Sequence, residues 1–227
     1  MADVAEEGLR HALKAERSIA PKSNVRAAWE AILKDARDCT RCDLYKFATQ
    51  TVFGEGPLDA SIVFVGEQPG DQEDLAGRPF VGPAGAVFDD ALKKAGIDRS
   101  TVYVTNAVKH FKFIQRGKRR IHNKPDSGEI TACRWWIDQE RELIKPAVTV
   151  ALGATAARSL VGKAVTIGKV RGVPLKLHDG SECWVTVHPS SILRMPDQDA
   201  RHEARLLFVR DLKRIRERVA ELADQKR

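Results

Sequence analysis

Residues 61–74, with the sequence SIVFVGEQPGDQED, carry the clearest indication of the fold. They begin with a short apolar run, residues 61–65, and a continuous run of this kind is typical of a strand buried on both faces. A loop rich in glycine and proline follows from Gly66. Because ligands gather at the carboxyl ends of the strands in parallel sheets, we expect this loop to contribute to a functional site.

The same order of strand, loop and helix recurs toward the C-terminus. We predict strands over residues 102–108, 148–152 and 183–187, and helices over residues 24–38, 85–95, 127–144, 154–160 and 199–224. Strands that alternate with helices predict an α/β fold in which a parallel sheet is covered on both sides. The loops that begin at Gly66, Asn106, Gly153 and His188 would then lie at one edge of that sheet.

The composition is that of a soluble globular protein. The chain has 227 residues, of which 43% are hydrophobic and 30% are charged. Residues 1–22 alternate charges without an apolar stripe and are interrupted by Pro21, so we expect a flexible arm there. We expect a single domain over residues 23–227.

Neither a membrane span nor a secretion signal is expected. The longest apolar stretch, residues 147–157, is too short and too interrupted to cross a bilayer. The first residues carry acidic side chains and lack the apolar centre of a signal peptide. We therefore expect a cytoplasmic protein that does not bind membranes.

Basic residues outnumber acidic ones, and many of them gather in one segment. The chain has 38 basic and 31 acidic residues, and the resulting charge of +7 is by itself weak support for a polyanionic partner. An uninterrupted basic run is formed by Lys109, Lys112, Arg116, Lys118, Arg119, Arg120 and Lys124. Such a run is usually a solvated loop. Here Phe111, Phe113 and Ile121 interleave with the charges, which favours a strand or loop that packs on one side and faces phosphates on the other.

The chain has four cysteines, Cys39, Cys42, Cys133 and Cys183. A CxxC pair with two distant single cysteines favours a metal or cluster site in a reducing compartment. Structural zinc sites usually take their ligands as two closely spaced pairs, and the second pair is split here. We therefore favour a [4Fe–4S] cluster, whose thiolates have variable spacing. Zinc remains an alternative, as do unrelated buried thiols at Cys133 and Cys183.

Three loops carry residues that suit the recognition of a small ligand. The glycines of the first loop permit a close approach of the backbone to a ligand, although the loop has no phosphate-binding signature. Asn106 offers an acceptor and two donors, and His188, followed by a proline, can donate a hydrogen bond to developing negative charge. Each feature has a structural alternative: a long turn, a capping Asn and a structural His.

Four segments together resemble a known family. They are GEQPGDQED with GRPFVGPAG (residues 66–85), TNAVKH (105–110), KRRIH (118–122) and HPSSILR (188–194). In this order, and with the four cysteines, they resemble the uracil-DNA glycosylase superfamily, and most of all its iron–sulfur branch of the UdgX type. The resemblance covers roughly residues 39–194. Its specific part is KRRIH, since ordinary family 4 glycosylases share the cysteines and the HPS loop but lack this basic insertion.

The resemblance implies a fold, a cofactor and an activity. The fold would be a three-layer α/β/α arrangement with a central four-stranded parallel sheet. The cofactor would be a [4Fe–4S] cluster held by the four cysteines. The activity would be excision of uracil from DNA by a bacterial-type, nucleoid-associated repair protein, followed by covalent trapping of the sugar in a single turnover.

The resemblance also implies roles in binding uracil. Phe80 would stack on the base, and Gln68 and Asp71 would line its pocket. Asn106 would read the edge of the base and reject cytosine, which presents a donor where uracil presents an acceptor. His188 would bond to uracil O2 while the departing base gains negative charge.

Covalent trapping would use His122 as the nucleophile, with Arg120 positioning its loop. In the best-known branch of the superfamily a carboxylate in the first motif orients water, and the matching residue here is the neutral Gln68. We therefore expect Glu67 to accept a proton from one nitrogen of His122 while the other nitrogen attacks C1′ of the sugar. The basic neighbours disfavour a further positive charge and should keep His122 neutral.

The DNA contacts would come from KRRIH and from the HPS loop. The residues concerned are Lys118, Arg119, Arg120, Ser190, Ser191, Ile192 and Arg194. Ile192 lies where relatives carry an apolar wedge, and the alternative is that it packs its own loop. The expected partner is uracil-containing DNA, with single strands accepted, and the expected product is free uracil. We expect a monomer.

Two other functions stay open. The first is a family 4-type uracil-DNA glycosylase that turns over and releases an abasic site. The second is a non-catalytic iron–sulfur module that binds uracil or single strands.

Overall fold

A computed structural model describes residues 22–225 of the chain. The predicted N-terminal arm, residues 1–22, lies outside this range except for Lys22, at which the first described helix, α2 (Lys22–Arg37), begins. No helix in the described range is long and apolar enough to cross a membrane.

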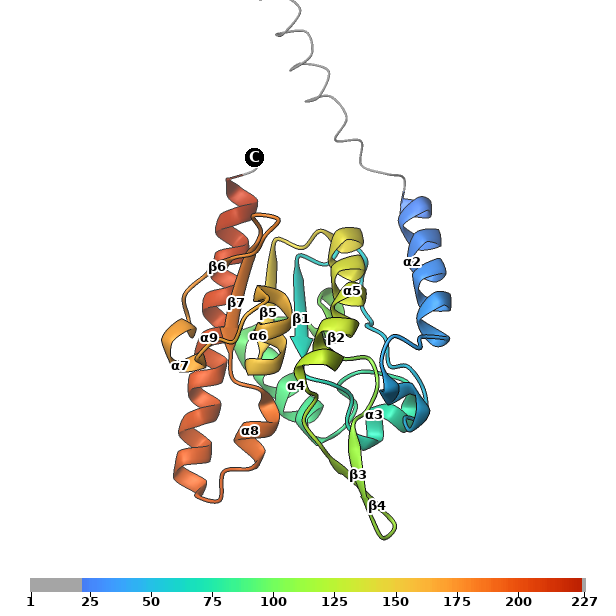
Figure 1. Cartoon of the computed structure of the whole chain (residues 1–227). Helices are drawn as coiled ribbons and strands as arrows, with labels where there is room; N and C mark the ends of the chain where they lie inside the picture. The colour runs from blue at the N-terminus through green and yellow to red at the C-terminus, as the bar shows by residue number, and fades with distance from the viewer. Residues whose placement is uncertain (1–21, 226–227) are drawn as a thin grey trace, which may run out of the picture.

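The centre of the molecule is a mostly parallel sheet (Figure 1). Its strands are β1 (Ile62–Gly66), β2 (Tyr103–Asn106), β5 (Val148–Leu152), β6 (Leu175–Lys176) and β7 (Glu182–Thr186), in the order β2-β1-β5-β7-β6. The four predicted strands are confirmed and pair in parallel. The structure adds β6, an edge strand of two residues that pairs antiparallel with β7, and β2 ends at Asn106, before the predicted end of its strand.

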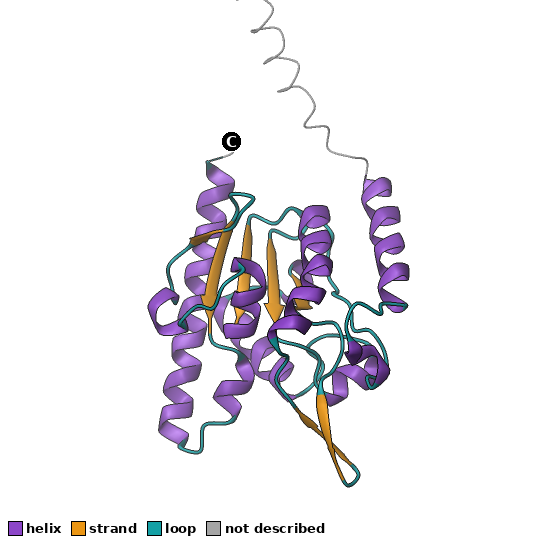
Figure 2. Ribbon diagram, viewed as in Figure 1, coloured by secondary structure: helices purple, strands orange, loops and turns teal. Residues whose placement is uncertain are grey.

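Helices cover both faces of the sheet, as predicted (Figure 2). One face packs on α4 (Pro83–Ala95), α8 (Pro189–Leu193) and α9 (Gln198–Asp224), and the other on α5 (Ser127–Ile144) and α6 (Ala154–Val161). Side chains alternate between the faces of a strand. In β1, Phe64 accordingly joins the first layer, whereas Val63 and Val65 join the second. The strands read as continuous apolar runs because both faces are buried.

A third, smaller core lies beside this sandwich. It joins α2, the short 3-10 helix η1 (Asp43–Lys46) and α5 through buried side chains that include Leu44, Phe53 and Trp136. Phe53 and Trp136 meet edge to face with their ring centroids 5.9 Å apart. Two of the cysteines, Cys39 and Cys133, are buried in this core.

The remaining elements are short. They are α3 (Asp71–Ala76), η2 (Arg99–Thr101), α7 (Ile167–Val170) and the two strands β3 (Phe113–Arg116) and β4 (Arg119–His122). β3 and β4 form an antiparallel hairpin separate from the main sheet. Figure 1 shows this hairpin projecting from the end of the molecule toward which β1 points, so it lies on the side of the carboxyl ends of the parallel strands.

Candidate active site

The predicted functional loops meet at the carboxyl ends of the parallel strands. Gly66 and Asn106 are the last residues of β1 and β2 and pair with each other in the sheet. Gly153 follows β5, and its N–H bonds to the carbonyl of Thr186, the last residue of β7, at 2.9 Å. The His188 loop begins two residues later. The hydrogen bonds of the sheet therefore fix the starting points of these loops at one edge.

Gly66 leaves room for two of the residues expected to bind the base. A Cβ atom at this position would collide with Asn106 Oδ1 and would lie 2.8 Å from Phe80 Cζ. The amide of Asn106 and the ring of Phe80 therefore both lie against the backbone of Gly66. The rings of Phe80 and His188 are stacked, at 28° and 6.4 Å between centroids. Phe80, Asn106 and His188 thus come together, as the sequence predicted.

Phe80 has an unusual backbone conformation. Its φ is +59°, in the left-handed region that side chains other than glycine rarely adopt. Gly85 leaves room for this conformation, because a Cβ at that position would collide with the Phe80 carbonyl. The ring is buried and packs on Phe88 at 5.1 Å between centroids. Strain of this kind gathers at functional sites, and nothing in the sequence pattern indicated it.

His188 is held in one protonation state. Its Nδ1 accepts the backbone N–H of Ser190 at 3.2 Å and lies 2.8 Å from the hydroxyl of that residue. Burial lowers the pKa of His188 to about 4, with Glu67 opposing the shift and Arg194 and His122 adding to it. The ring is therefore neutral near pH 7. Since Nδ1 is an acceptor, the single proton is on Nε2, which can donate.

The hairpin brings His122 to the first loop. His122 Nε2 lies 3.2 Å from Glu67 Oε1, and the other oxygen of Glu67 accepts a hydrogen bond from Thr155 at the start of α6. Burial raises the pKa of Glu67, but the bonds from His122 and Thr155 outweigh it, and the pKa lies below its usual value. A carboxylate can only accept, so the nitrogen of His122 that faces Glu67 carries the proton. In the neutral form of the ring, the other nitrogen keeps its lone pair.

A tight turn determines where His122 lies. β3 and β4 are connected by only Gly117 and Lys118, and Gly117 has a φ of +58°, as two-residue hairpin turns require. His122 pairs with Phe113 in the ladder, and the rings of His122 and Phe111 are 6.3 Å apart. The side of the hairpin that carries His122 also carries Arg120, because alternate residues of a strand share a face.

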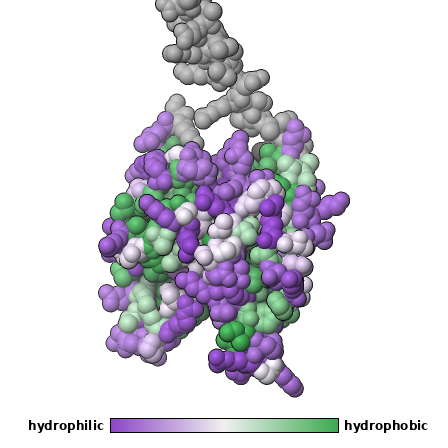
Figure 3. All heavy atoms as spheres, viewed as in Figure 1, coloured by the Kyte–Doolittle hydropathy of each residue, from purple (hydrophilic) through white to green (hydrophobic). Residues whose placement is uncertain are grey.

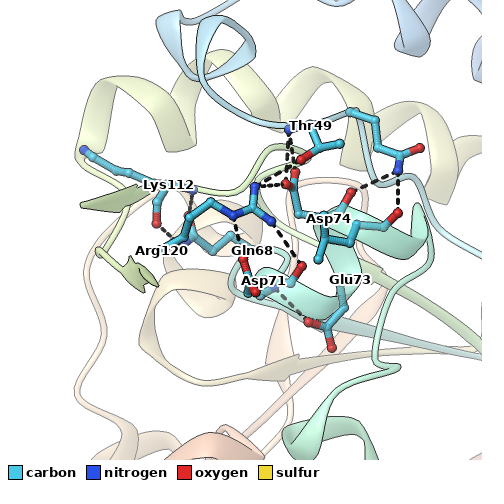
Figure 4. A network of polar contacts seen from close by, with 10 residues as sticks. Thr49, Gln68, Asp71, Glu73, Asp74, Lys112 and Arg120 are labelled. Atoms are coloured by element: carbon cyan, nitrogen blue, oxygen red, sulfur yellow. Dashed lines mark hydrogen bonds and ion pairs between the residues drawn. The ribbon is translucent and has the colours of Figure 1, made fainter. Parts of the chain in front are cut away.

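Arg120 ties the hairpin to the first loop and to α3 (Figure 4). Its Nε lies 2.6 Å from Asp71, and its Nη1 lies 2.6 Å from the fully buried Asp74 and 3.0 Å from the hydroxyl of Thr49. Its guanidinium also lies over the ring of Phe113 at 5.2 Å. Asp71, expected in the base pocket, is engaged here by Arg120. Asp74 is a partner that the sequence reasoning missed.

Gln68 also contacts the hairpin. Its amide nitrogen donates to the carbonyls of Lys112 and Asn123, at 3.1 and 3.0 Å, and its oxygen accepts the N–H of Lys112 at 3.2 Å. Lys112 and Asn123 flank the two hairpin strands, and Asn123 N–H bonds to the carbonyl of Lys112 at 2.9 Å. Gln68 therefore clamps the base of the hairpin from the first loop (Figure 4).

The basic segment divides into exposed and engaged residues. Arg116, Lys118, Arg119 and Lys124 are exposed. Lys112 instead pairs with Glu129 at 2.8 Å and with Asp126 at 3.2 Å. Ile121, expected on the packed side, is 40% exposed beside Ile114, because it shares the outer hairpin face with Arg119. Figure 3 shows hydrophilic residues over much of this end of the molecule together with hydrophobic patches on the hairpin side, and a notch between the hairpin and the start of α9.

Lys109 does not belong to the basic surface. Its side chain is fully buried, and its ammonium lies 2.6 Å from the buried carboxylate of Glu140. The ammonium also donates to the Asn106 carbonyl at 3.0 Å and to Thr105 Oγ1 at 2.5 Å. The expectation that Lys109 faces phosphates is therefore wrong. The residue instead braces the chain directly after Asn106 from inside the core.

The HPS loop is packed rather than open. Ile192 is fully buried in the first core layer, so the structure supports the packing interpretation and not an exposed wedge. Ser191 Oγ bonds to the His188 carbonyl at 2.7 Å, and Ser190 caps the His188 ring. Arg194 follows α8 as its C-cap residue. Ser190 and Ser191 are partly exposed at the site, and Arg194 is exposed.

Three of the four cysteines gather, and the fourth does not. Cys39 and Cys133 are buried in the third core, and Cys42 packs against it. Cys39 accepts a hydrogen bond from Trp136 Nε1, and Cys133 accepts one from the Lys109 N–H, both at 3.2 Å. Cys183 lies instead in β7 within the second layer. Among residues 22–225, no three His, Cys, Asp or Glu side chains are close enough together to hold one metal ion.

The fold and this loop arrangement are those of a glycosylase that acts on nucleic acid bases. A sequence profile of the uracil DNA glycosylase superfamily matches residues 53–213. The chain belongs to this superfamily, and the first part of the predicted resemblance is confirmed.

Three individual relatives of this chain carry the name type-4 uracil-DNA glycosylase. The type-4 uracil-DNA glycosylase of Thermotoga maritima is 40% identical over 189 residues, which cover 82% of this chain and 92% of that protein. That of Sulfurisphaera tokodaii is 36% identical over 197 residues, or 83% of each chain. That of Pyrobaculum aerophilum is 35% identical over 171 residues, covering 70% of this chain and 82% of that protein. These names agree with a family 4-type enzyme and do not distinguish a UdgX type.

Proposed function

We propose that this protein excises uracil from DNA. The observation that carries the proposal is the convergence of Phe80, Asn106 and His188 at the edge of the sheet, in a chain that belongs to the uracil-DNA glycosylase superfamily. The type-4 relatives support the same activity. The substrate is uracil-containing DNA, and the product of excision is free uracil.

Recognition of the base follows from the pocket. The target nucleotide leaves the stack, which costs a few kcal/mol, and the ring of Phe80 offsets part of that cost by stacking. Asn106 pairs with the edge of uracil. Cytosine presents a donor in place of an acceptor there, and a pocket built on hydrogen bonds penalises such a mismatch strongly.

Bond cleavage follows from His188. As the N-glycosidic bond breaks, negative charge grows on the base and positive charge grows on C1′. The Nε2–H of neutral His188 donates to uracil O2 and stabilises the departing anion. The Ser190 N–H supports this role, because it occupies Nδ1 and keeps the proton on Nε2.

A separate proposal concerns C1′ of the sugar after the base has left. In this proposal His122 forms a covalent bond to C1′. The supporting observation is the contact between His122 Nε2 and Glu67. In a neutral ring that donates to Glu67 from Nε2, the other nitrogen has a free lone pair. That nitrogen forms a bond to C1′ while the proton on Nε2 passes to Glu67. The product is a neutral alkyl-imidazole, which is a poor leaving group, so the reaction stops after one turnover.

A specific observation also favours turnover with water. The relatives are named as type-4 uracil-DNA glycosylases, and these names match the alternative that releases an abasic site more closely than covalent capture. In that alternative Glu67, with its lowered pKa, remains ionised near C1′ and orients a water molecule. Both forms share the excision step.

The cofactor proposed with this function is a [4Fe–4S] cluster. Cys39, Cys42 and Cys133 supply three thiols in one core, and two of them accept N–H hydrogen bonds, which tune cluster thiolates in iron–sulfur proteins. The cluster would fix the segments around the CxxC turn and the start of the Asn106 loop. No step of the excision passes through it.

The experiment uses oligonucleotides with a single uracil, single-stranded and double-stranded, incubated with the wild-type protein. Free uracil is measured by mass spectrometry, and a denaturing gel resolves free DNA from protein-linked DNA. We expect the wild type to release uracil and to give a slowly migrating band of protein-linked DNA. His122→Ala should release uracil without giving this band. An abasic oligonucleotide as the sole DNA product would reject capture, and absence of free uracil would reject excision and leave a binding module.

A further inference from the structure

His110 is a buried histidine to which the sequence assigns no role. It lies directly after Lys109, and its side chain is 3% exposed. One ring nitrogen, Nε2, lies 2.9 Å from Thr51 Oγ1. The other, Nδ1, is buried with no hydrogen-bond partner among the described residues. A buried polar atom without a partner is rare in native proteins and needs an explanation.

The contacts of Thr51 define the tautomer of this ring. The hydroxyl of Thr51 has one proton, which it donates to the Ala36 carbonyl at 2.8 Å. The hydroxyl oxygen can therefore only accept from His110, so the proton of the neutral ring is on Nε2. Nδ1 is left unprotonated, with its lone pair directed into the protein interior. An unprotonated imidazole nitrogen whose partner nitrogen donates to a fixed acceptor is the usual state of a metal-binding histidine.

Hydrogen bonds connect the segment around His110 with the segments that carry Cys133 and Cys39. The preceding N–H, that of Lys109, bonds to Cys133 Sγ at 3.2 Å. On the other side, the Ala36 carbonyl that accepts from Thr51 also accepts the N–H of Cys39, at 3.2 Å. His110 therefore directly follows the residue whose N–H bonds to the Cys133 thiol, and a chain of three hydrogen bonds, through Thr51 and the Ala36 carbonyl, links its ring to the Cys39 N–H.

Cys183 has the opposite surroundings. It lies in the middle of the sheet, pairing with Thr149 of β5 and Leu175 of β6. Its thiol is fully buried among apolar side chains of the second layer and donates a long hydrogen bond to the Trp184 carbonyl at 3.9 Å. The three gathered thiols lie in or against the third core, whereas Cys183 lies in the second layer of the sandwich. Cys183 behaves as a small core residue.

We propose that His110, through Nδ1, and not Cys183, is the fourth protein ligand of the iron–sulfur cluster, together with Cys39, Cys42 and Cys133. The inference rests on the cluster proposed above and replaces one residue of its expected ligand set. Each iron of a four-iron cluster takes its own protein ligand, so the donors need not converge as closely as around a single ion. Thr51 holds the ring from its far side.

The ligand change has a measurable consequence. A neutral imidazole brings one negative charge less than a thiolate, and replacement of thiolates by histidines raises the reduction potential of iron–sulfur centres. The cluster of the wild-type protein should therefore be easier to reduce than that of a His110→Cys variant. A purely structural role for His110 would not move this potential.

The direct test is spectroscopic and uses the full-length protein purified without oxygen. Iron and acid-labile sulfide are measured first. The cluster is then reduced and examined by pulsed electron paramagnetic resonance, with and without isotopically labelled histidine. We expect a nitrogen coupling to the cluster that changes with the label and disappears in His110→Cys. A wild-type cluster without histidine coupling, or a protein that binds no iron and sulfide, would overturn the proposal.

Variants supply an independent test. Cys183→Ala should keep the wild-type iron content, whereas His110→Ala and Cys133→Ala should lose most of it. His110→Cys should keep the cluster and show a lower reduction potential, which guards against a variant that simply misfolds. Loss of iron in Cys183→Ala, with retention in His110→Ala, would assign the ligand to Cys183.

Uracil release is measured on the same samples, which separates this inference from the proposed function. A protein that releases uracil but shows no histidine coupling contradicts the ligand assignment alone. A protein with histidine coupling that releases no uracil contradicts the function alone.

Discussion

The two histidines of the candidate site are held in contrasting ways. His188 follows a buried strand, is capped by a backbone N–H and is kept neutral by its surroundings. His122 lies at the base of a projecting hairpin, as the last residue of β4, with 44% of its side chain exposed, and is held by Glu67 of the first loop. The sheet therefore positions His188 at its edge, whereas the hairpin that carries His122 is held in place by polar side-chain contacts. Excision and capture should accordingly be separable by mutation.

The largest expected effect is on the sheet side. His188→Ala removes the donor to the departing base, and loss of one such donor lowers kcat by about 10²–10³-fold. Uracil release under single-turnover conditions measures it. His178→Ala, at an exposed histidine outside the site, is the matched control and should stay close to wild type. Equal losses in both variants would contradict the assigned donor.

The next largest effect is expected from a change in the packing of Asn106 and Phe80 against Gly66. In Gly66→Ala the new methyl group meets Asn106 and Phe80, and overpacking of this kind costs about 1–3 kcal/mol. We expect weaker binding of uracil DNA and slower excision, measured by titration and by uracil release. Gly168→Ala, at a glycine with open space around it, should change neither. An active Gly66→Ala would mean that the base binds elsewhere.

Loss of the contacts of Arg120 in the hairpin should lower both the stability of the protein and the covalent capture of the sugar. Arg120→Ala leaves the buried carboxylate of Asp74 without its ion-pair partner, a loss that costs about 1–3 kcal/mol for a buried polar group. Chemical denaturation measures the free energy of unfolding. Arg119→Ala, on the exposed face of the same strand, should be neutral. Covalent capture should fall in Arg120→Ala with less effect on uracil release, and the reverse pattern would contradict the separation.

The pH dependence of stability tests the neutral state of His188. Its pKa in the folded protein, about 4, is below its usual value of 6.5. The unfolded chain therefore binds more protons between these values, and the free energy of unfolding falls as the pH drops through them, by at most about 1.4 kcal/mol per pH unit. Melting temperatures between pH 7 and pH 4 should fall less in His188→Gln than in the wild type. Identical slopes would reject the lowered pKa.

The smallest effect concerns DNA affinity. Lys118 and Arg119 are exposed at the hairpin turn without an ion-pair partner in the described structure. If each contacts a phosphate, replacement of either by alanine should reduce the slope of log affinity against log salt by about 0.7 on single strands and about 0.9 on duplexes. Fluorescence anisotropy at several salt concentrations measures it. An unchanged slope would remove the hairpin turn from the DNA interface.

The sequence predicted the sheet and the convergence of Phe80, Asn106 and His188 at its edge, because both depend on local patterns. Buried strands followed by glycine-rich or polar loops identify the sheet edge, so Asn106 and His188 could be placed together in advance. Side-chain burial was harder to predict. The basic run predicts Lys109 on the surface, but Lys109 is buried. For Ile192 the sequence leaves a wedge and a packed residue as alternatives, and Ile192 is packed, since charge and apolarity in one short segment do not reveal which side faces the core.

Partners distant in sequence were also missed. Asp74 and Thr155 bond to Arg120 and Glu67 only after the chain has folded. Likewise, the separation of Cys183 from the other cysteines is a consequence of strand order, because β7 lies on the far side of β5 from the segments that carry Cys39 and Cys133. Spacing along the chain carries no information of this kind.

The most direct test of the central claim counts free uracil and protein-linked DNA in one reaction with excess uracil oligonucleotide. The account predicts uracil release that stops at one molecule per protein, with an equal amount of linked DNA mapped by mass spectrometry to His122. Continued release of uracil without linked DNA would contradict capture by the hairpin, and no release at all would contradict the site itself.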